Sequence, residues 1–235
     1  MDGSDGPSPF VVAVDGPGGS GKSTVARTVA IRLKLGYLDT GAMYRALTWA
    51  VLAAGVAVDD PVGLEELAHA SVIELSTDPR EGAVRVNGRD VTVAIRGSDV
   101  TSAVSAVSAV PAVRCVLVAL QQDFIRRAER GIVVEGRDIG TVVAPEAPVK
   151  VFLTASVDVR ATRRAAESGS GSGIPAFRAA RDSLQRRDAL DSSRPADPLR
   201  RAEDAWELDS TDLTLDEVVE LVLARCIHAG LTVPA

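Results

Sequence analysis

Residues 16–23, Gly-Pro-Gly-Gly-Ser-Gly-Lys-Ser, decide the fold that we expect for this 235-residue chain. They match the pattern G-x-x-x-x-G-K-[ST] at every fixed position. Glycines allow backbone dihedrals that other residues avoid, so successive N–H groups can point inward and hold an anion. The apolar run Phe10–Val14 before the loop predicts a buried strand, and Lys22–Leu35, followed by Gly36, predicts a helix. A strand, a phosphate-binding loop and a helix indicate a nucleotide site in a parallel α/β sheet.

The parts of this loop have separate expected roles toward a bound ATP or GTP. Lys22 would reach the β- and γ-phosphates as a point charge, and the Ser23 hydroxyl would ligate Mg²⁺. The backbone N–H groups and the N-terminus of the helix would bind the remaining phosphate oxygens. The predicted ATP-binding residues are Gly16, Pro17, Gly18, Gly19, Ser20, Gly21, Lys22, Ser23 and Thr24.

A nucleotide loop leaves three classes open: a small-molecule kinase, a GTP switch, and a motor or regulatory ATPase. A GTP switch needs an Asn-Lys-x-Asp element, but Asn87 is the only Asn in the chain and lies in a predicted turn. A motor ATPase would show an apolar strand ending in Asp-Glu, whereas the best candidate strand ends in Val134-Glu135-Gly136-Arg137. Many arginines follow later in the chain, which favours a kinase that also clamps a second phosphorylated substrate.

The remaining elements are predicted from apolar periodicity and turn residues. They are the helices Met43–Ala54, Ser102–Val110, Pro111–Arg130, Asp158–Ala166, Ala176–Ala189 and Leu215–Ala229, a hairpin of Ala83–Val86 and Asp90–Val93 around Asn87-Gly88, and the strands Ile132–Val134, Val149–Leu153 and Trp206–Leu208. The Ser/Gly tract Ser168–Gly173 reads as a flexible linker between two arginine-rich helices.

Together these elements predict one α/β domain over residues 10–235, a three-layer P-loop kinase core around a parallel sheet. Two segments interrupt it. One is an inserted subdomain at about 67–100 with a small antiparallel sheet; the family resemblance described below implies that this insert binds a monophosphate. The other is an arginine-rich helical lid at about 158–195. Residues 1–9 are acidic and rich in Gly, Pro and Ser, which predicts a disordered tail and does not resemble a signal peptide.

Composition limits the partners that we expect. The formal net charge is -6, which argues against binding to a nucleic-acid polymer. Cys115 and Cys226 lie far apart without metal-ligand spacing, and His69 and His228 are isolated, so neither a disulfide, a zinc site nor a catalytic His is expected. No apolar run has the length of a membrane span. We expect a cytoplasmic monomer without a membrane partner.

Several segments resemble one family of nucleoside monophosphate kinases. Leu38–Arg45 reads Leu-Asp-Thr-Gly-Ala-Met-Tyr-Arg, and Glu135–Val143 reads Glu-Gly-Arg-Asp-Ile-Gly-Thr-Val-Val. Pro148–Leu153, the Arg- and Asp-rich stretch 187–194 and Leu208–Thr211 follow in the same order. The chain from about Val11 to Ile227 thus resembles the bacterial cytidylate kinases, which implies transfer of the ATP γ-phosphoryl group to CMP or dCMP.

The resemblance also implies roles for single residues. Arg45 and Arg137 would grip the CMP phosphate. The cytosine edge would be read by Ser105, Arg114 and Asp138, the acceptor pocket lined by Thr40 and Tyr44, and the ribose held by Arg187 and Asp191 with Arg194 beside them. Arg163 or Arg164 would move with the lid onto ATP, so the implied catalytic residues are Lys22, Arg137, Arg163 and Arg164.

Simpler interpretations stay open for several of these residues. Arg45 or Arg137 could form a surface ion pair, Asp138 could pair with Arg114, Asp191 could be a helix charge, and Ser105 could belong to the small face of its helix. Two other functions also stay open: a P-loop kinase for UMP, dTMP, AMP or a non-nucleotide acid, and a nucleotide-binding regulatory protein.

Overall fold

The computed structural model describes residues 9–167 and 173–231. Its centre is a parallel five-stranded sheet with the strand order β2-β6-β1-β7-β8. The strands are β1 (Val11–Asp15), β2 (Gly36–Asp39), β6 (Ile132–Glu135), β7 (Val149–Thr154) and β8 (Trp206–Asp209). Because β1 is in the middle of the sheet and its side chains alternate between the two faces, it contributes to two separate cores.

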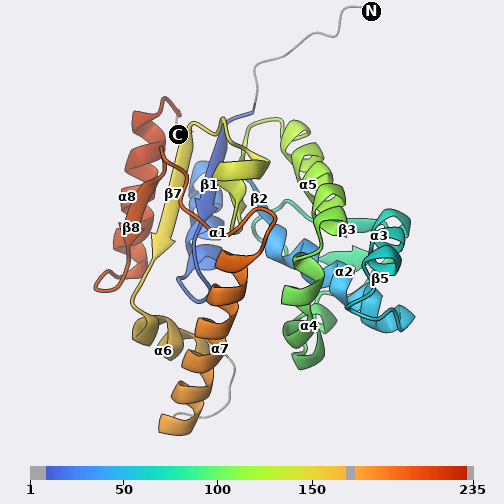
Figure 1. Ribbon diagram of the computed structural model, residues 1–235. Coiled ribbons are helices and arrows are strands. Elements are labelled where there is room, and N and C mark those ends of the chain that lie inside the picture. The colour runs from blue at the N-terminus through green and yellow to red at the C-terminus, as the bar shows by residue number, and fades with distance from the viewer. Residues whose placement is uncertain (1–8, 168–172, 232–235) are drawn as a thin grey trace, which may run out of the picture.

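The sheet is covered on both faces, which gives the three layers that the sequence predicts. Val12 and Val14 pack in one core with α1 (Lys22–Leu33) and α8 (Leu215–His228). Val11 and Ala13 pack in the opposite core, which includes residues of α2 (Thr40–Ala54) and α5 (Pro111–Arg126). In Figure 1 α8 lies to the left of the sheet, α2 to α5 lie to its right, and α6 and α7 lie below it.

A second core forms between helices α2 to α5 and a small antiparallel sheet. The sheet has the order β3-β4-β5 and consists of β3 (Ile73–Leu75), β4 (Val84–Val86) and β5 (Arg89–Asp90). The predicted turn is present, since Asn87 and Gly88 have φ angles of 51° and 76°. The second hairpin strand is shorter than predicted, because the chain leaves the ladder after Asp90 and forms the 3₁₀ turn η1 (Ala94–Arg96) before α4 (Ser98–Ser108).

Several predicted boundaries were wrong, and one helix was missed. Helix α1 ends at Leu33 rather than Leu35, since Lys34 takes a left-handed conformation (φ 54°), and Gly36 begins β2 instead of ending the helix. Helix α2 begins three residues before Met43, capped by the Asp39 carboxylate, which accepts the Ala42 N–H at 2.9 Å. The missed helix, α3 (Pro61–Ala70), buries only Leu64 and Ala68, so its apolar pattern is weak.

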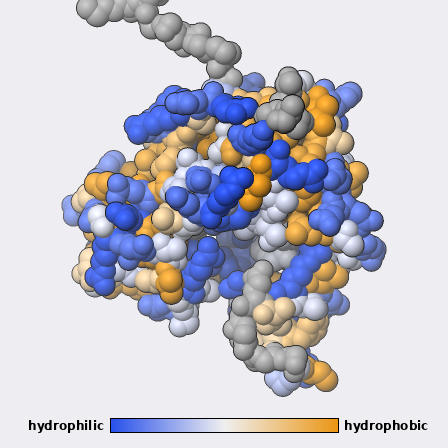
Figure 2. All heavy atoms as spheres, turned by 180° about the vertical axis from the view of Figure 1, so that it is seen from behind, coloured by the Kyte–Doolittle hydropathy of each residue, from blue (hydrophilic) through white to orange (hydrophobic). Residues whose placement is uncertain are grey.

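The arginine-rich segment folds as two helices, α6 (Val157–Glu167) and α7 (Ile174–Ser193), which pack against each other. Five residues between them, 168–172, contain most of the predicted Ser/Gly linker and lie outside the described residues, as does nearly all of the predicted tail. Within the described parts of the chain, no single helix is long and apolar enough to cross a membrane. Helices α4 and α5 have the length and composition of a membrane span only when they are taken together, and the chain bends by 100° between them. Apolar residues are scattered among hydrophilic ones on the face shown in Figure 2.

Candidate active site

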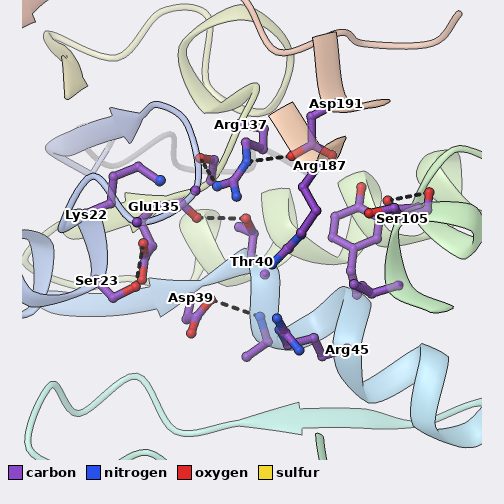
Figure 3. Close-up of a pocket in the computed structure, with 18 of the residues that line it drawn as sticks. Lys22, Ser23, Asp39, Thr40, Arg45, Ser105, Glu135, Arg137, Arg187 and Asp191 are labelled. Atoms are coloured by element: carbon purple, nitrogen blue, oxygen red, sulfur yellow. Dashed lines mark hydrogen bonds and ion pairs between the residues drawn. The ribbon is translucent and has the colours of Figure 1, made fainter. Parts of the chain in front are cut away.

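A cavity of about 320 Å³ lies between the phosphate loop, the start of α2, helix α4, the segment after β6 and the two lid helices. It brings most of the predicted site residues together, although they come from distant parts of the chain (Figure 3). The predicted residues that line it are Gly18, Gly19, Gly21, Lys22, Ser23, Thr24, Thr40, Tyr44, Arg45, Ser105, Arg137, Asp138, Arg164, Arg187, Asp191 and Arg194.

The phosphate loop follows β1 and turns directly into α1, as the motif predicts. A glycine is required at Gly16, because its φ is 146° and a Cβ there would lie 2.0 Å from the Leu153 carbonyl oxygen. The Lys22 ammonium donates to the Pro17 carbonyl oxygen at 2.7 Å, so the loop's own backbone holds it over the anion site. Burial, and then the charge of Arg137, lowers the pKa of Lys22 to about 7. An anion in the loop would therefore relieve an unfavourable positive charge.

Glu135 is a site residue that the sequence did not predict. It ends β6, is almost fully buried, and its carboxylate accepts the Ser23 hydroxyl at 3.0 Å and the Tyr37 hydroxyl at 2.5 Å. Burial, and then the charge of Asp39, raises the pKa of Glu135 to about 7. The available signal was a carboxylate at the end of an apolar strand, which the sequence interpretation set aside because it lacked an Asp-Glu pair. Ser23 and Glu135 together present oxygen donors, the ligand type that Mg²⁺ prefers.

Arginines gather on the other side of the cavity. Arg45 donates to the Thr101 hydroxyl at 3.0 Å, and burial, followed by repulsion from Arg187 and Arg164, lowers its pKa to about 10. The pKa of Arg187 is also lowered, by burial and then by Arg137, and its Nε atom is buried without a hydrogen-bond partner. Crowded, partly desolvated guanidinium groups of this kind suit an anionic ligand such as a phosphate.

Two ion pairs connect the segment after β6 to other elements. Arg137 donates through Nε to Asp191 of α7 at 2.9 Å. Asp138 pairs with Arg114 of α5, and Arg194 lies 3.6 Å from its second carboxylate oxygen. Burial raises the pKa of Asp138 in spite of these arginines. The Asp138–Arg114 pair that the sequence left open as a structural interpretation is thus present, and the same Asp138 also lines the cavity.

The remaining acceptor-side residues make mostly internal contacts. Arg114 is buried behind the cavity surface, donates to Asp197 at 2.7 Å, and lies over the Tyr44 ring at 5.4 Å from its centroid. The Tyr44 hydroxyl is buried without a hydrogen-bond partner. Thr40 donates its hydroxyl to the Glu135 carbonyl oxygen at 2.7 Å, and the Ser105 carbonyl oxygen accepts the Ser108 hydroxyl at 3.2 Å.

The two lid arginines that the sequence could not separate face different cavities. Arg164 lines the cavity described above. Arg163 donates to the Ser20 and Ser210 carbonyl oxygens at 3.2 and 3.0 Å, and it lines a second cavity of about 380 Å³ that also borders the loop. Apolar residues close that cavity, among them Leu213, Leu215 and Val218.

Three more charged residues that the sequence did not single out support the site. Asp15 ends β1 and accepts the backbone N–H groups of Ile139 and Gly140 at 2.8 and 2.7 Å, which fixes the segment after Asp138. Arg160 and Asp188 come from the lid helices and both contact Gly18 of the loop. Asp188 belongs to the Arg- and Asp-rich stretch 187–194 that carried the resemblance, but no role was predicted for it, and the only signal for Arg160 was the excess of arginine in its segment.

Comparisons with known proteins agree with one another. The family model described as Cytidylate kinase matches residues 12–228. A protein named Cytidylate kinase from Streptomyces avermitilis is 49% identical over 213 residues, which cover 91% of this chain and 90% of the relative. Relatives with the same name from Streptomyces griseus and Nocardia farcinica are each 50% identical; the matches cover 92% and 95% of this chain and 92% and 97% of the relatives.

Proposed function

Because the chain belongs to the cytidylate kinase family, ATP-dependent enzymes that phosphorylate CMP or dCMP, we propose how its own residues divide this reaction. The observation that carries the proposal is the shared cavity. Lys22 and Ser23 of the phosphate loop line it together with Arg45, Arg137 and Asp138. A donor phosphate on the loop and an acceptor phosphate on the arginines would therefore face each other across one cavity.

The transfer itself depends on position and charge rather than on a base. The acceptor oxygen belongs to a phosphate that is already anionic, so no proton has to be removed by a strong base. Lys22 binds the donor phosphates, while Arg137 and Arg164 line the same cavity and stabilise the charge of the phosphoryl group in flight. The lid helices exclude water, which limits hydrolysis of ATP.

Ser23 and Glu135 are the residues that fit a Mg²⁺ ion. Their oxygen atoms are 3.0 Å apart, and a hydroxyl and a carboxylate are ligand types that would hold this ion. The ion would neutralise negative charge on the ATP phosphates. Tyr37 keeps the Glu135 carboxylate in place from its other oxygen.

The acceptor nucleotide is recognised by three groups of residues. Arg45 and Arg137 bind its phosphate, and Arg187, Asp191 and Arg194 bind its ribose. Ser105, Arg114 and Asp138 read the cytosine edge, with Thr40 and Tyr44 in the wall. Cytosine presents an amino donor to the Asp138 carboxylate, whereas uracil presents a carbonyl oxygen there and loses the contact.

The second cavity suits the nucleoside part of ATP. It adjoins Gly19, Ser20 and Gly21 of the loop and combines apolar walls with the Arg163 guanidinium group. A nucleotide with its phosphates on the loop can extend into this space without entering the acceptor cavity. Arg163 thus belongs to the donor side and Arg164 to the transfer side of the site.

The proposal also includes how the chain is organised and where it works. Residues 10–235 form one kinase domain, with a monophosphate-binding insert at about 67–100 and a lid at about 158–195. The protein works in the cytoplasm as a monomer on free nucleotides, without nucleic-acid or membrane partners. The net charge of -6 supports the absence of a nucleic-acid partner.

The experiment that tests the function measures ADP production in a coupled assay with ATP, Mg²⁺ and a panel of acceptors. The panel contains CMP, dCMP, UMP, dTMP, AMP and shikimate. We expect rapid turnover with CMP and dCMP and slow turnover with the others. Rapid turnover with another acceptor would keep the kinase and reject the cytosine contacts, and ATP binding without acceptor-dependent turnover would indicate a regulatory protein.

A further inference from the structure

Asp188 of α7 and Arg160 of α6 hold one residue of the phosphate loop from both sides of its peptide backbone. The Gly18 N–H donates to Asp188 Oδ1 at 3.1 Å, and Arg160 Nη1 donates to the Gly18 carbonyl oxygen at 2.9 Å. Arg160 Nη1 also donates to Asp188 Oδ2 at 2.5 Å, which closes a ring of three contacts. Both backbone polar groups of Gly18 are thus satisfied by side chains of the lid.

This ring is largely shielded from solvent. Arg160 is 8% exposed, and its Nε atom donates to the Ala155 carbonyl oxygen at 3.0 Å just before α6. Leu184, one turn before Asp188, packs so closely that a Cβ on Gly18 would lie 3.0 Å from its Cδ2 atom. Charge-assisted hydrogen bonds in a partly desolvated place are stronger than those on an open surface.

The position of Asp188 in its helix gives the ring a consequence for the reaction. Arg187 precedes it directly and Asp191 follows one turn later, and both line the acceptor cavity. Asp191 in turn accepts Arg137 at 2.9 Å. Gly18 lies in the same short loop as Lys22. The Lys22 ammonium donates to the carbonyl oxygen of Pro17, the residue that directly precedes Gly18. A single helical turn of α7 therefore contacts both the donor loop and the acceptor residues.

We propose that Asp188 is a positioning residue, which sets the distance between the donor and acceptor phosphates by fixing α7 on the phosphate loop, with Arg160 as its partner. This role rests on the kinase function proposed above. Neither residue lies among the groups that bind the substrates in that proposal. Their contribution would appear in the transfer step, since the transfer rate falls steeply when two reacting groups are slightly misplaced.

The test compares three single variants of the full chain. Asp188→Ala removes both contacts of the carboxylate, and Asp188→Asn keeps an acceptor for the Gly18 N–H but loses the charge opposite Arg160. The matched control is Arg181→Ala, because Arg181 Nε pairs with Asp158 at 3.0 Å and joins the same two helices on the exposed side, away from the loop. For each protein, kcat and the KM values for ATP and CMP are measured, together with the midpoint of thermal unfolding.

For Asp188→Ala we expect kcat to fall about 10- to 100-fold, with each KM changed less than about threefold, as for a loss of geometry rather than of binding. The fall in kcat should be smaller for Asp188→Asn, and the kcat of Arg181→Ala should equal that of the wild type. Should Asp188→Ala not fold at the assay temperature, the kcat of Asp188→Asn decides the question.

Three results would overturn the proposal while leaving the proposed function intact. One is a lower unfolding midpoint with wild-type kcat, which would make the ring purely structural. Another is an equal loss of kcat in Arg181→Ala, which would mean that helix packing alone matters. The third is a raised KM for ATP at unchanged kcat, which would make Asp188 part of ATP binding. A wild-type protein without CMP turnover would instead reject the proposed function.

Discussion

The Ser23 hydroxyl donates a hydrogen bond of 3.0 Å to Glu135, which lies 112 residues further along the chain. The bond joins the phosphate loop to the end of the neighbouring strand β6, since β1 and β6 pair in parallel. A second bond, of 2.5 Å from the Tyr37 hydroxyl, holds the other carboxylate oxygen. The buried carboxylate therefore has a fixed orientation toward the residue that we assign to Mg²⁺.

Replacing Glu135 by Gln should weaken the binding of Mg²⁺ more than the binding of CMP. The amide keeps the size of the side chain but removes the negative charge that would attract the ion. We expect kcat to fall about 10- to 100-fold, in the range seen when residues that support a metal are lost. The Mg²⁺ concentration for half-maximal rate should rise. Both are measured in an Mg²⁺ titration at saturating ATP and CMP.

Tyr37→Phe is the matched control for this prediction, because it removes the second hydrogen bond of Glu135 and leaves the Ser23 contact unchanged. Because this variant keeps the charge of Glu135 and loses only one of the two contacts that orient it, the Mg²⁺ concentration for half-maximal rate should rise less than in Glu135→Gln. If both variants showed the same Mg²⁺ dependence, the effect of Glu135→Gln would come from local packing and not from the ion.

Lys22→Ala should remove transfer activity and leave the fold stable. Burial lowers the pKa of Lys22 to about 7, so the charged ammonium is costly in the protein without nucleotide, and its loss should not lower the unfolding midpoint. The rate should fall about 100- to 1,000-fold, as for other preorganised charge-stabilising groups. The checks are single-turnover transfer and thermal unfolding on one preparation. Near-normal turnover would remove Lys22 from the donor site.

The sequence predicted the parts of the site that are encoded locally. The phosphate loop needs only its own glycines and the helix that follows, and Asn87-Gly88 encodes its turn without help from the rest of the chain. Four of the five strands of the parallel sheet were predicted from short apolar runs, but β2 (Gly36–Asp39) was not, because Gly36 was interpreted as the end of the first helix. The identity of the acceptor-side residues came from resemblance rather than from pattern, because no local rule connects Arg45 with Arg137.

The unpredicted residues have partners that are distant in sequence. Asp188 contacts a loop residue 170 positions earlier, and Asp15 contacts Ile139 at a separation of 124. Charges in a helix are usually solvated, so the arginine-rich segment gave no reason to single out Arg160. Helix α3 was missed for a different reason, since two buried residues produce little periodicity, although Asp60 before Pro61 is a start signal.

Asp15→Asn should change the pH dependence of stability between about pH 4 and pH 6. Burial raises the pKa of Asp15 from 3.8 to about 6, so over this range the folded protein binds a proton that the unfolded chain has released. The Asp15 contribution to the free energy of unfolding is therefore largest below about pH 4 and declines as the pH rises through 6. The decline corresponds to about 3 kcal/mol.

Urea unfolding of the wild type and of Asp15→Asn at several pH values checks this prediction. The amide does not titrate, so the variant should become more stable relative to the wild type as the pH rises from 4 to 6. Other buried groups, such as Glu135, titrate in both proteins and cancel in the difference. A constant difference across this range would show that Asp15 keeps an ordinary pKa.

Arg137→Ala should weaken the binding of CMP far more than the binding of ATP. Arg137 lines the acceptor cavity, and its Nε contact to Asp191 orients the guanidinium group there. Loss of a charged hydrogen bond costs about 1.5–3 kcal/mol, which corresponds to about 10- to 150-fold in the KM for CMP. Initial-rate kinetics with each substrate varied in turn separate the two effects. Arg126→Ala, on the exposed side of α5, should change neither KM. Equal losses for both substrates would mean that Arg137 acts elsewhere than on the acceptor phosphate.

Asp138→Asn should reduce the preference for CMP over UMP by about 100-fold or more, since a site built around a polar contact rejects the wrong partner strongly. The Asp138 carboxylate accepts from Arg114 and can accept the cytosine amino group, but it offers nothing to the uracil carbonyl oxygen. An amide nitrogen can donate to that oxygen. The ratio of kcat/KM for CMP to that for UMP measures the change.

Asp197→Asn is the control for this prediction, because Asp197 is the second carboxylate on Arg114, at 2.7 Å, and does not line the acceptor cavity. If Asp138 acts by facing the base, Asp197→Asn should leave the CMP to UMP ratio near that of the wild type. An equal loss of preference in both variants would mean that the two carboxylates act only by holding Arg114. Arg114 itself would then be the residue that reads the cytosine edge.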